Sequence, residues 1–208
     1  GIEAVVLEAH DIGSGGSGRN GGHPTPTFHF RPEFSLTNLK KRLGDETAAR
    51  LIDLQTGAAD LIFGLVDKYG IDCELERVGC IHAAHTPSMM PALAAKHADY
   101  QSLGRPMRLL DRDQTATLTG SDKFHGAWVY ENAGHLQPLS YARGLARAAL
   151  KEGARIFTHS PVNRLERSGT KWRLTTPQGT VTADFVVLAT GAYSSALWPP
   201  LKRTYAHF

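Results

Sequence analysis

The chain alternates between short apolar runs and longer segments with helical spacing. Apolar runs at Ala4–Leu7 and Phe185–Tyr193, the second ending in small residues and a glycine, predict parallel strands that are buried on both faces. Apolar residues three and four apart between Asp45 and Gly70 predict one long helix, with an acidic first turn and a glycine at its end. The apolar stripe of this helix is expected to pack against a sheet.

The same two periods, together with turn residues, predict the remaining elements. The other expected helices are Ser35–Leu43, Pro91–Leu103, Asp113–Leu118 and the helix from Pro138 to Gly153. The other expected strands are Asp72–Val78, Cys80–Ala84, Met107–Leu110, Ala127–Tyr130 and Arg155–Thr158, with Pro161–Glu166, Lys171–Thr176 and Thr180–Ala183 as an antiparallel ribbon. The two strands around Gly79 are expected to form a hairpin-like pair, and the helix at Pro138 to return the chain to a parallel sheet.

The order of these elements predicts an α/β fold with an inserted α+β layer. We expect a Rossmann-like parallel sheet interrupted by an antiparallel sheet. Because the first residues already form what would be the second strand, the sheet is expected to lack its first strand, glycine turn and first helix. The chain also ends soon after the second apolar run, so we interpret it as truncated at both ends.

Composition and charge exclude several classes of protein. Of 208 residues, 41% are hydrophobic and 21% charged, which is typical of a globular protein. The net charge of +3 and the lack of a basic tract with interleaved aromatics disfavour nucleic acid as a partner. No apolar run approaches about 18 residues and no signal peptide is recognisable, so we expect a cytoplasmic protein without a membrane span. Cys73 and Cys80 are expected to be reduced, and the oligomeric state is not indicated.

The candidate chemistry begins directly after the first apolar run. Glu8 occupies the carboxyl end of the predicted strand, where dinucleotide-binding folds place the acid that hydrogen-bonds the ribose hydroxyls. The glycine-rich segment from Gly13 to Gly22 follows, and its glycines allow positive φ and the close approach of a ligand. Arg19 within it adds a planar fork suited to phosphate. A flexible Gly/Ser linker is the alternative, because the glycines form no clean G-x-G-x-x-G motif.

Three motifs resemble one family. Leu7-Glu8-Ala9 followed by SGRNGG at 17–22 resembles the second-strand region of FAD-dependent oxidoreductases of the D-amino-acid oxidase (DAO) type, particularly the glycine/sarcosine oxidase and gamma-glutamylputrescine oxidase branch. GHLQPL at 134–139 resembles the family element that connects the substrate sheet back to the cofactor domain. ADFVVLATGAYS at 183–194 matches the family pattern AD-x-V-V-x-A-T-G-A-Y/W-S, although an ordinary core strand with a glycine turn is the alternative for this last run.

The resemblance implies FAD as the cofactor and assigns its contacts. Residues 1–32 and 137–208 would be parts of the FAD-binding domain, and 33–136 part of the substrate-binding domain. The implied cofactor-binding residues are Glu8 for the adenosine ribose, Arg19, Asn20, Gly21 and Gly22 for the pyrophosphate and the approach to the ring, Val162 for adenine through its main chain, and Ala189, Thr190 and Gly191 for a second backbone approach. No metal site is expected, and no catalytic residue is assigned.

The resemblance also implies a reaction. In the family, an amine or amino acid loses a hydride to FAD, and the resulting imine hydrolyses to a carbonyl. A small-molecule substrate similar to gamma-glutamylputrescine or to glycine and sarcosine is expected. Two alternatives stay open: a truncated, inactive fragment that cannot retain FAD, and a protein of the same fold that uses NAD.

Overall fold

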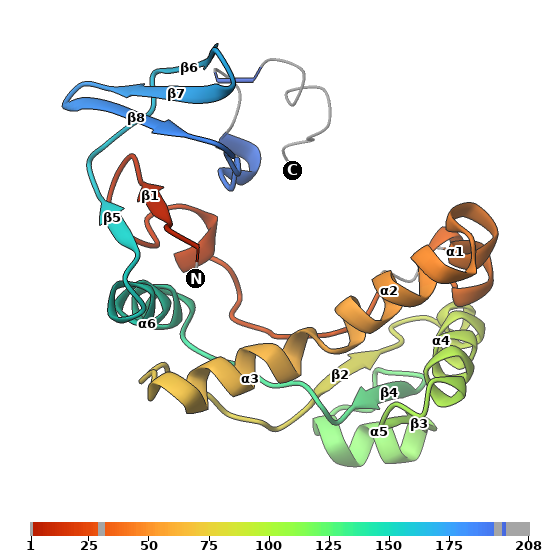
Figure 1. Ribbon diagram of the computed structural model, residues 1–208. Helices are drawn as coiled ribbons and strands as arrows, with labels where there is room; N and C mark the ends of the chain where they lie inside the picture. Colours follow the sequence, from red (N-terminus) through yellow and green to blue (C-terminus); the bar gives the residue numbers. More distant parts are fainter. Residues whose placement is uncertain (1, 29–31, 194–196, 199–208) are drawn as a thin grey trace. The chain divides into compact units, whose positions relative to one another are not determined.

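The computed structural model describes residues 2–28, 32–193 and 197–198, which fold as two compact units (Figure 1). The first unit contains both ends of the described chain, up to Asn20 and from Pro138 onward. The second unit is the continuous segment Gly21–Gln137. The chain therefore leaves the first unit within the glycine-rich segment and returns to it where the helix at Pro138 begins.

A parallel pair of strands forms the centre of the first unit. Strand β1 (Val5–Leu7) pairs in parallel with β5 (Arg155–Phe157), and Val6 lies opposite Ile156. Helix α6 (Pro138–Lys151) packs against β5 and leads into it. The helix begins at a proline, whose fixed φ suits the first turn, and is followed by Gly153 at φ +91°. The predicted return to a parallel sheet is confirmed.

An antiparallel ribbon completes the first unit. Its strands are β6 (Arg164–Ser168), β7 (Lys171–Thr176) and β8 (Gly179–Ala183), in the order β6-β7-β8. The central strand places Trp172 opposite Arg167 and Ala183, and the guanidinium of Arg167 lies 4.2 Å from the centre of the Trp172 ring. The predicted three-stranded ribbon is therefore confirmed.

The strand expected over Phe185–Tyr193 is wrong. Residues 185–190 have irregular backbone and pair with no strand in the described part of the chain. Val186 and Leu188 face a small apolar hollow of about 150 Å³ that ribbon residues also line, whereas Phe185 and Val187 are 89% and 87% exposed. The segment alternates as a strand would, but only one of its faces is covered and its backbone has no neighbouring strand to bond.

The second unit is built on an antiparallel sheet. Strands β2 (Cys80–Ala83), β3 (Met107–Leu110) and β4 (Ala127–Tyr130) pair in the order β2-β4-β3. Helix α4 (Met90–Ser102) covers one face of the sheet, and α5 (Arg112–Thr119) follows β3 with Asp111 as the acceptor of a capping box. The core between α4 and the sheet contains the buried residues Leu93, Tyr100, Met107, Trp128 and Tyr130.

Three further helices precede this sheet in the second unit. They are α1 (Leu36–Leu43), α2 (Asp45–Thr56) and α3 (Ala58–Tyr69). The single long helix predicted over this region is divided at Gly57, which ends α2 and precedes α3. The expected packing of the apolar stripe on a sheet is also wrong for α2, because Ala48 and Ile52 pack with Phe28 and α1 instead. Leu54 on the opposite face is 74% exposed.

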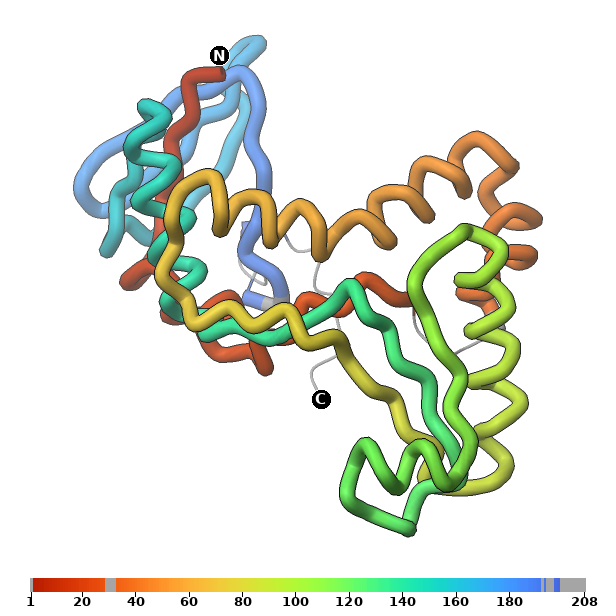
Figure 2. Tube along the Cα trace, turned by 90° about the horizontal axis from the view of Figure 1, so that it is seen from below, coloured from red at the N-terminus to blue at the C-terminus, as the bar shows by residue number. Residues whose placement is uncertain are grey.

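The hairpin predicted around Gly79 is also wrong. The segment that follows α3 runs beside the segment that precedes α6 (Figure 2), and Glu76 exchanges both backbone hydrogen bonds with His135 at 2.9 and 3.0 Å. Beyond Gly79, β2 pairs with β4. Gly79 has φ +77°, and a Cβ there would lie 2.9 Å from the carbonyl oxygen of Tyr130. The glycine therefore marks a close approach between neighbouring strands and not a hairpin turn.

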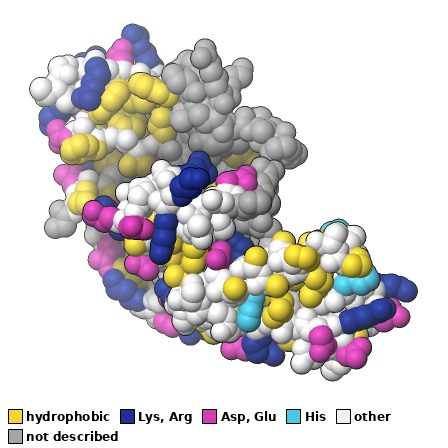
Figure 3. Space-filling model, turned by 90° about the vertical axis from the view of Figure 1, so that its right-hand side faces the viewer, with side chains coloured by type: hydrophobic (Ala, Val, Ile, Leu, Met, Phe, Trp, Pro, Cys, Tyr) yellow, Lys and Arg dark blue, Asp and Glu magenta, His cyan; other side chains and the backbone are white. Residues whose placement is uncertain are grey.

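On the face shown in Figure 3, the Lys and Arg side chains of the described residues lie among Asp and Glu side chains. No helix in the described ranges has both the length and the apolar character needed to cross a bilayer. Cys73 and Cys80 are free thiols.

Candidate cofactor-binding site

The carboxyl ends of β1 and β5 place Glu8 at one edge of the parallel pair. The amide of Glu8 donates to the carbonyl of Phe157 at 2.9 Å, and its carbonyl accepts from the amide of Ser160 at 2.8 Å. The side chain is half-buried, and its Oε1 accepts from the amide of His10 at 2.9 Å. Backbone hydrogen bonds thus fix Glu8 on both sides, so the acid is presented from a rigid strand end.

Val162 lies two residues beyond Ser160, where the chain passes from β5 into the ribbon. It is half-buried. The next amide, that of Asn163, donates to the carbonyl of Thr175 in β7 at 2.9 Å. The first unit therefore places Val162 on the connection that leaves the same strand end as Ser160, the partner of Glu8.

The glycine-rich segment is packed on one side and open on the other. Residues Gly16–Gly18 form a 3₁₀ turn, and the side-chain amide of Asn20 donates to the carbonyls of Gly16 and Ser17 at 3.1 and 2.9 Å. A Cβ at Gly18 would collide with the carbonyl of Gly13 and lie 2.9 Å from Leu139 on α6. A Cβ at Gly16 would meet nothing within 4 Å. The turn therefore presents bare backbone on its open side.

Arg19 and the motif at 189–193 meet through Tyr193. The Nη2 of Arg19 donates to the Tyr193 hydroxyl at 3.1 Å, and its Nε donates to the carbonyl of Gly15 at 3.4 Å. The amide of Tyr193 donates to the carbonyl of Thr190 at 3.0 Å, which closes a short turn over Gly191. Gly191 has φ +51° with open space beside it, and Ala189 and Thr190 are exposed. The side chain of Arg19 therefore bonds a residue of the turn over Gly191 within the first unit.

Gly21 and Gly22 belong to the second unit. The carbonyl of Gly22, which has φ +67°, accepts from the amide of Leu136 at 2.9 Å. A Cβ at Gly21 would lie 3.1 Å from the imidazole of His23. The cofactor-binding roles of all the predicted residues stay predictions. Apart from these two glycines, those residues lie in the first unit: Glu8, Arg19, Asn20, Val162, Ala189, Thr190 and Gly191.

Sequence reasoning missed two side chains of this region. Tyr193 is predicted only as the end of an apolar strand, and no local signal indicates its contact with Arg19 across 174 residues of sequence. His159 has φ +50°, and its Nε2 lies 3.2 Å from Oδ1 of Asp11. Nothing in the sequence near His159 indicated that pairing, because it joins loops that are about 150 residues apart.

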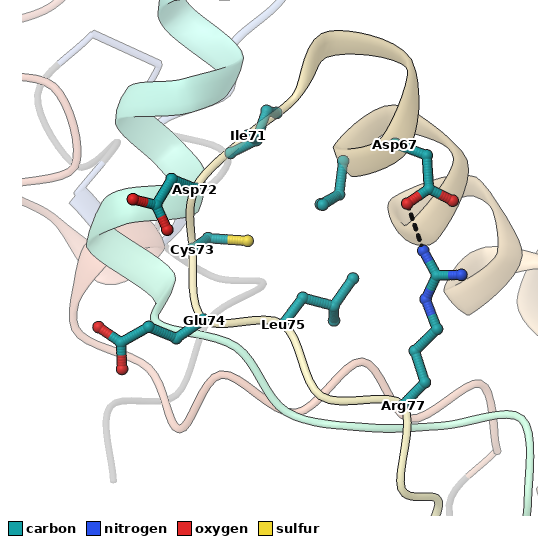
Figure 4. Close-up of a pocket in the computed structure, with 8 residues that line it drawn as sticks. Asp67, Ile71, Asp72, Cys73, Glu74, Leu75 and Arg77 are labelled. Carbon is teal, nitrogen blue, oxygen red and sulfur yellow. Dashed lines mark hydrogen bonds and ion pairs between the residues drawn. The ribbon is translucent and has the colours of Figure 1, made fainter.

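The second unit contains a separate cavity of about 570 Å³ between the end of α3 and residues 71–77 (Figure 4). The Cys73 and Leu75 side chains point into it, Asp72 and Glu74 point away, and Arg77 pairs with Asp67 at 2.6 Å along its wall. Burial, followed by the charge of Asp72, raises the pKa of the Cys73 thiol. The thiol is therefore protonated at neutral pH and is a poor nucleophile, so the cavity contains no activated group.

The parallel strand pair with its crossover helix, the acid at the strand end and the glycine turn together define a dinucleotide-binding α/β protein with an added antiparallel unit. A family model described as DAO, FAD dependent oxidoreductase, matches residues 1–207. The chain belongs to this family, whose cofactor is FAD.

The relatives agree with this family. The chain is 31% identical over 199 residues to a probable oxidoreductase OrdL from Haemophilus influenzae, and the matched region covers 95% of this chain and 45% of that protein. It is 30% identical over 194 residues to the gamma-glutamylputrescine oxidoreductase of Escherichia coli, covering 93% and 44%. A crystal structure of glycine oxidase from Geobacillus kaustophilus superposes with a TM-score of 0.72 at 24% identity, covering 93% of this chain and 50% of that one, which shows the fold. The chain spans less than half the length of the two curated relatives.

Proposed function

We propose that this chain is the cofactor-binding part of an oxidoreductase that oxidises the C–N bond of an amine or amino acid by hydride transfer to FAD. The observation that carries the proposal is the placement of Glu8 at the carboxyl end of β1, beside the strand end of β5. An acid in that position receives the hydroxyls of a ribose, because parallel strands present their carboxyl ends to the nucleotide.

The residues of the first unit fit a flavin dinucleotide. Glu8 would accept the adenosine ribose hydroxyls, and the main chain of Val162 would bond adenine. Arg19 brings positive charge to a turn whose open side, at Gly16, has no side chain to keep a diphosphate away. The open space beside Gly191 supports the second backbone approach. Asn20 would act by holding the turn in shape, since its amide already bonds two turn carbonyls.

The chemistry follows from the cofactor. FAD, when bound, supplies the hydride acceptor, and the imine left on the substrate hydrolyses to a carbonyl. The protein's own contribution is to bind and orient the cofactor. Ile71-Asp72-Cys73 and GHLQPL at 134–139 resemble gamma-glutamylputrescine oxidase-like enzymes. This resemblance favours a gamma-glutamylputrescine-like substrate, with a glycine- or sarcosine-like substrate as the second candidate. Anaerobic bleaching of the bound flavin by one of these amines and not by the other would decide between them.

Flavin binding tests the proposal directly. We expect the purified chain to take up FAD with a rise in melting temperature and to show no rise with NAD(H). Glu8→Ala should weaken FAD binding by about tenfold, because a hydrogen bond to a charged group contributes about 1.5 kcal/mol. Glu3→Ala is the matched control, since Glu3 is exposed and pairs with Arg155 at 2.5 Å. A shift with NAD but none with FAD would contradict the proposal. A chain that takes up neither would favour the inactive-fragment alternative.

A further inference from the structure

Tyr193 connects two segments that are more than 170 residues apart in the sequence. Its hydroxyl accepts from Arg19 across a sequence separation of 174 residues. A Cβ on Gly15 would lie 3.5 Å from the edge of the Tyr193 ring, so the ring lies beside the glycine-rich segment. Tyr193 is nevertheless 65% exposed and buries little apolar surface. Its contacts therefore affect the orientation of the Arg19 side chain more than the stability of the first unit.

Arg19 has a long side chain that is costly to hold in one direction. Burial or immobilisation of an arginine loses up to about 2 kcal/mol of rotamer entropy. Two of its five N–H donors are engaged within the unit, by the Gly15 carbonyl and by the Tyr193 hydroxyl. These two bonds come from Nε and Nη2 and fix the plane of the guanidinium. Among the described residues, they leave both Nη1 donors and one Nη2 donor for a ligand.

We propose that Tyr193 is a positioning residue for cofactor binding: its hydroxyl holds the Arg19 guanidinium so that the remaining donors face the diphosphate of FAD. This inference rests on the proposed function, because it requires that the glycine-rich segment receives the diphosphate. A preorganised arginine loses less entropy when the anion arrives, so the hydroxyl raises the affinity without touching the cofactor.

The turn that carries Tyr193 does not depend on the hydroxyl. The backbone hydrogen bond from Tyr193 to Thr190 closes the turn, and the ring edge that lies beside Gly15 consists of carbon atoms alone. Tyr193→Phe keeps both and removes only the bond to Arg19. The melting temperature of the variant without FAD should therefore equal that of the wild type.

A double-mutant cycle tests the inference through the dissociation constant for FAD, measured by quenching of flavin fluorescence. We expect Arg19→Met to weaken binding by about tenfold and Tyr193→Phe by about threefold, and we expect Tyr193→Phe to have no further effect in the Arg19→Met background. The loss caused by Arg19→Met should shrink at high salt. The matched controls are Tyr69→Phe, whose hydroxyl accepts from Lys68 in the second unit, and Arg147→Met on the exposed face of α6.

The outcomes distinguish a failure of the positioning role of Tyr193 from a failure of the proposed function. A threefold loss from Tyr193→Phe that persists in the Arg19→Met background, or no loss at all, overturns the positioning role and leaves the proposed function standing. Arg19→Met without effect overturns the role of Arg19 and this inference, while FAD binding itself remains. A wild-type chain that binds no FAD overturns both.

Discussion

Two apolar segments of this protein, β4 and residues 185–190, differ in secondary structure and in burial. In the second unit, β4 is buried along its whole length, and Leu93, Tyr100 and Trp128 pack between α4 and the sheet. In the first unit, the equally apolar segment 185–190 forms no strand and leaves Phe185 and Val187 exposed. The difference lies in the partners, because β4 has a strand on each side and a helix above it, whereas 185–190 has only the ribbon on one face.

The comparison teaches that an apolar run predicts the capacity for burial and that its neighbours decide the outcome. An antiparallel sheet of three strands with a covering helix closes a core from one continuous segment of chain. A parallel strand needs hydrogen-bonding neighbours and cover on both faces. In the described part of the first unit, β1 and β5 have only each other as neighbouring strands, and their faces are incompletely covered. Val6 and Phe157 therefore remain 42% and 47% exposed.

Truncating a core side chain should give the largest difference between the two regions. Leu93→Ala, at a fully buried position, is expected to lower the free energy of unfolding by about 2–5 kcal/mol, because it leaves a cavity under the sheet. Val187→Ala should change it by less than about 0.5 kcal/mol, since the side chain is in water already. Urea denaturation followed by circular dichroism measures both. A loss above about 1 kcal/mol for Val187→Ala would mean that the segment is buried in solution.

A methyl group added to the glycine turn should have an intermediate effect. Gly18→Ala forces its Cβ against the Gly13 carbonyl and Leu139, and we expect a loss of about 1–3 kcal/mol in the free energy of unfolding. Gly16→Ala is the matched control, because open space surrounds that position and the substitution should be close to neutral for stability. Equal losses for the two variants would contradict the one-sided packing of the turn. This pair sharpens the comparison by showing where the first unit is packed.

Lowering the pH should reduce the free energy of unfolding of the second unit, and this is the smallest of the three expected effects. The His82 ring stacks on Trp128 at 4.3 Å, and burial lowers the pKa of His82 below its ordinary value of 6.5. The unfolded chain therefore binds this proton more readily, so the contribution of His82 is complete above about pH 6.5 and is lost as the pH falls toward the folded-state pKa. His82→Phe should flatten that part of the urea-unfolding profile, whereas His85→Gln, at an exposed position, should not.

Much of the fold could be predicted from local pattern because its signals are local. Ser35 caps α1 by accepting from the amide of Asn38 at 3.3 Å. Helix α6 begins at Pro138 and ends at Lys151, shortly before the predicted stop signal Gly153. The strand that follows this helix made a parallel partner necessary, and β1 was the apolar run available to it. These predictions needed only periodicity and turn residues.

The failures involve partners that a local pattern does not contain. The segment at 72–78 pairs through Glu76 with His135 and not with β2, and Gly79 permits a close approach where a turn was expected. Gly57 divides a helix whose apolar spacing continues across it. In the candidate site, Glu8 and Arg19 carried chemical signals, whereas the contact between Arg19 and Tyr193 depends on a tertiary arrangement between distant segments.

The pairing of β1 with β5 has a consequence for the order in which the protein is assembled. Val5 lies opposite Arg155, so β1 must remain without its partner until about 150 more residues have left the ribosome. The second unit is continuous in sequence and can close its aromatic core during that interval. Its folding brings residues 21 and 137 into one domain and shortens the effective loop between the two strands, which lowers the entropic cost of joining them.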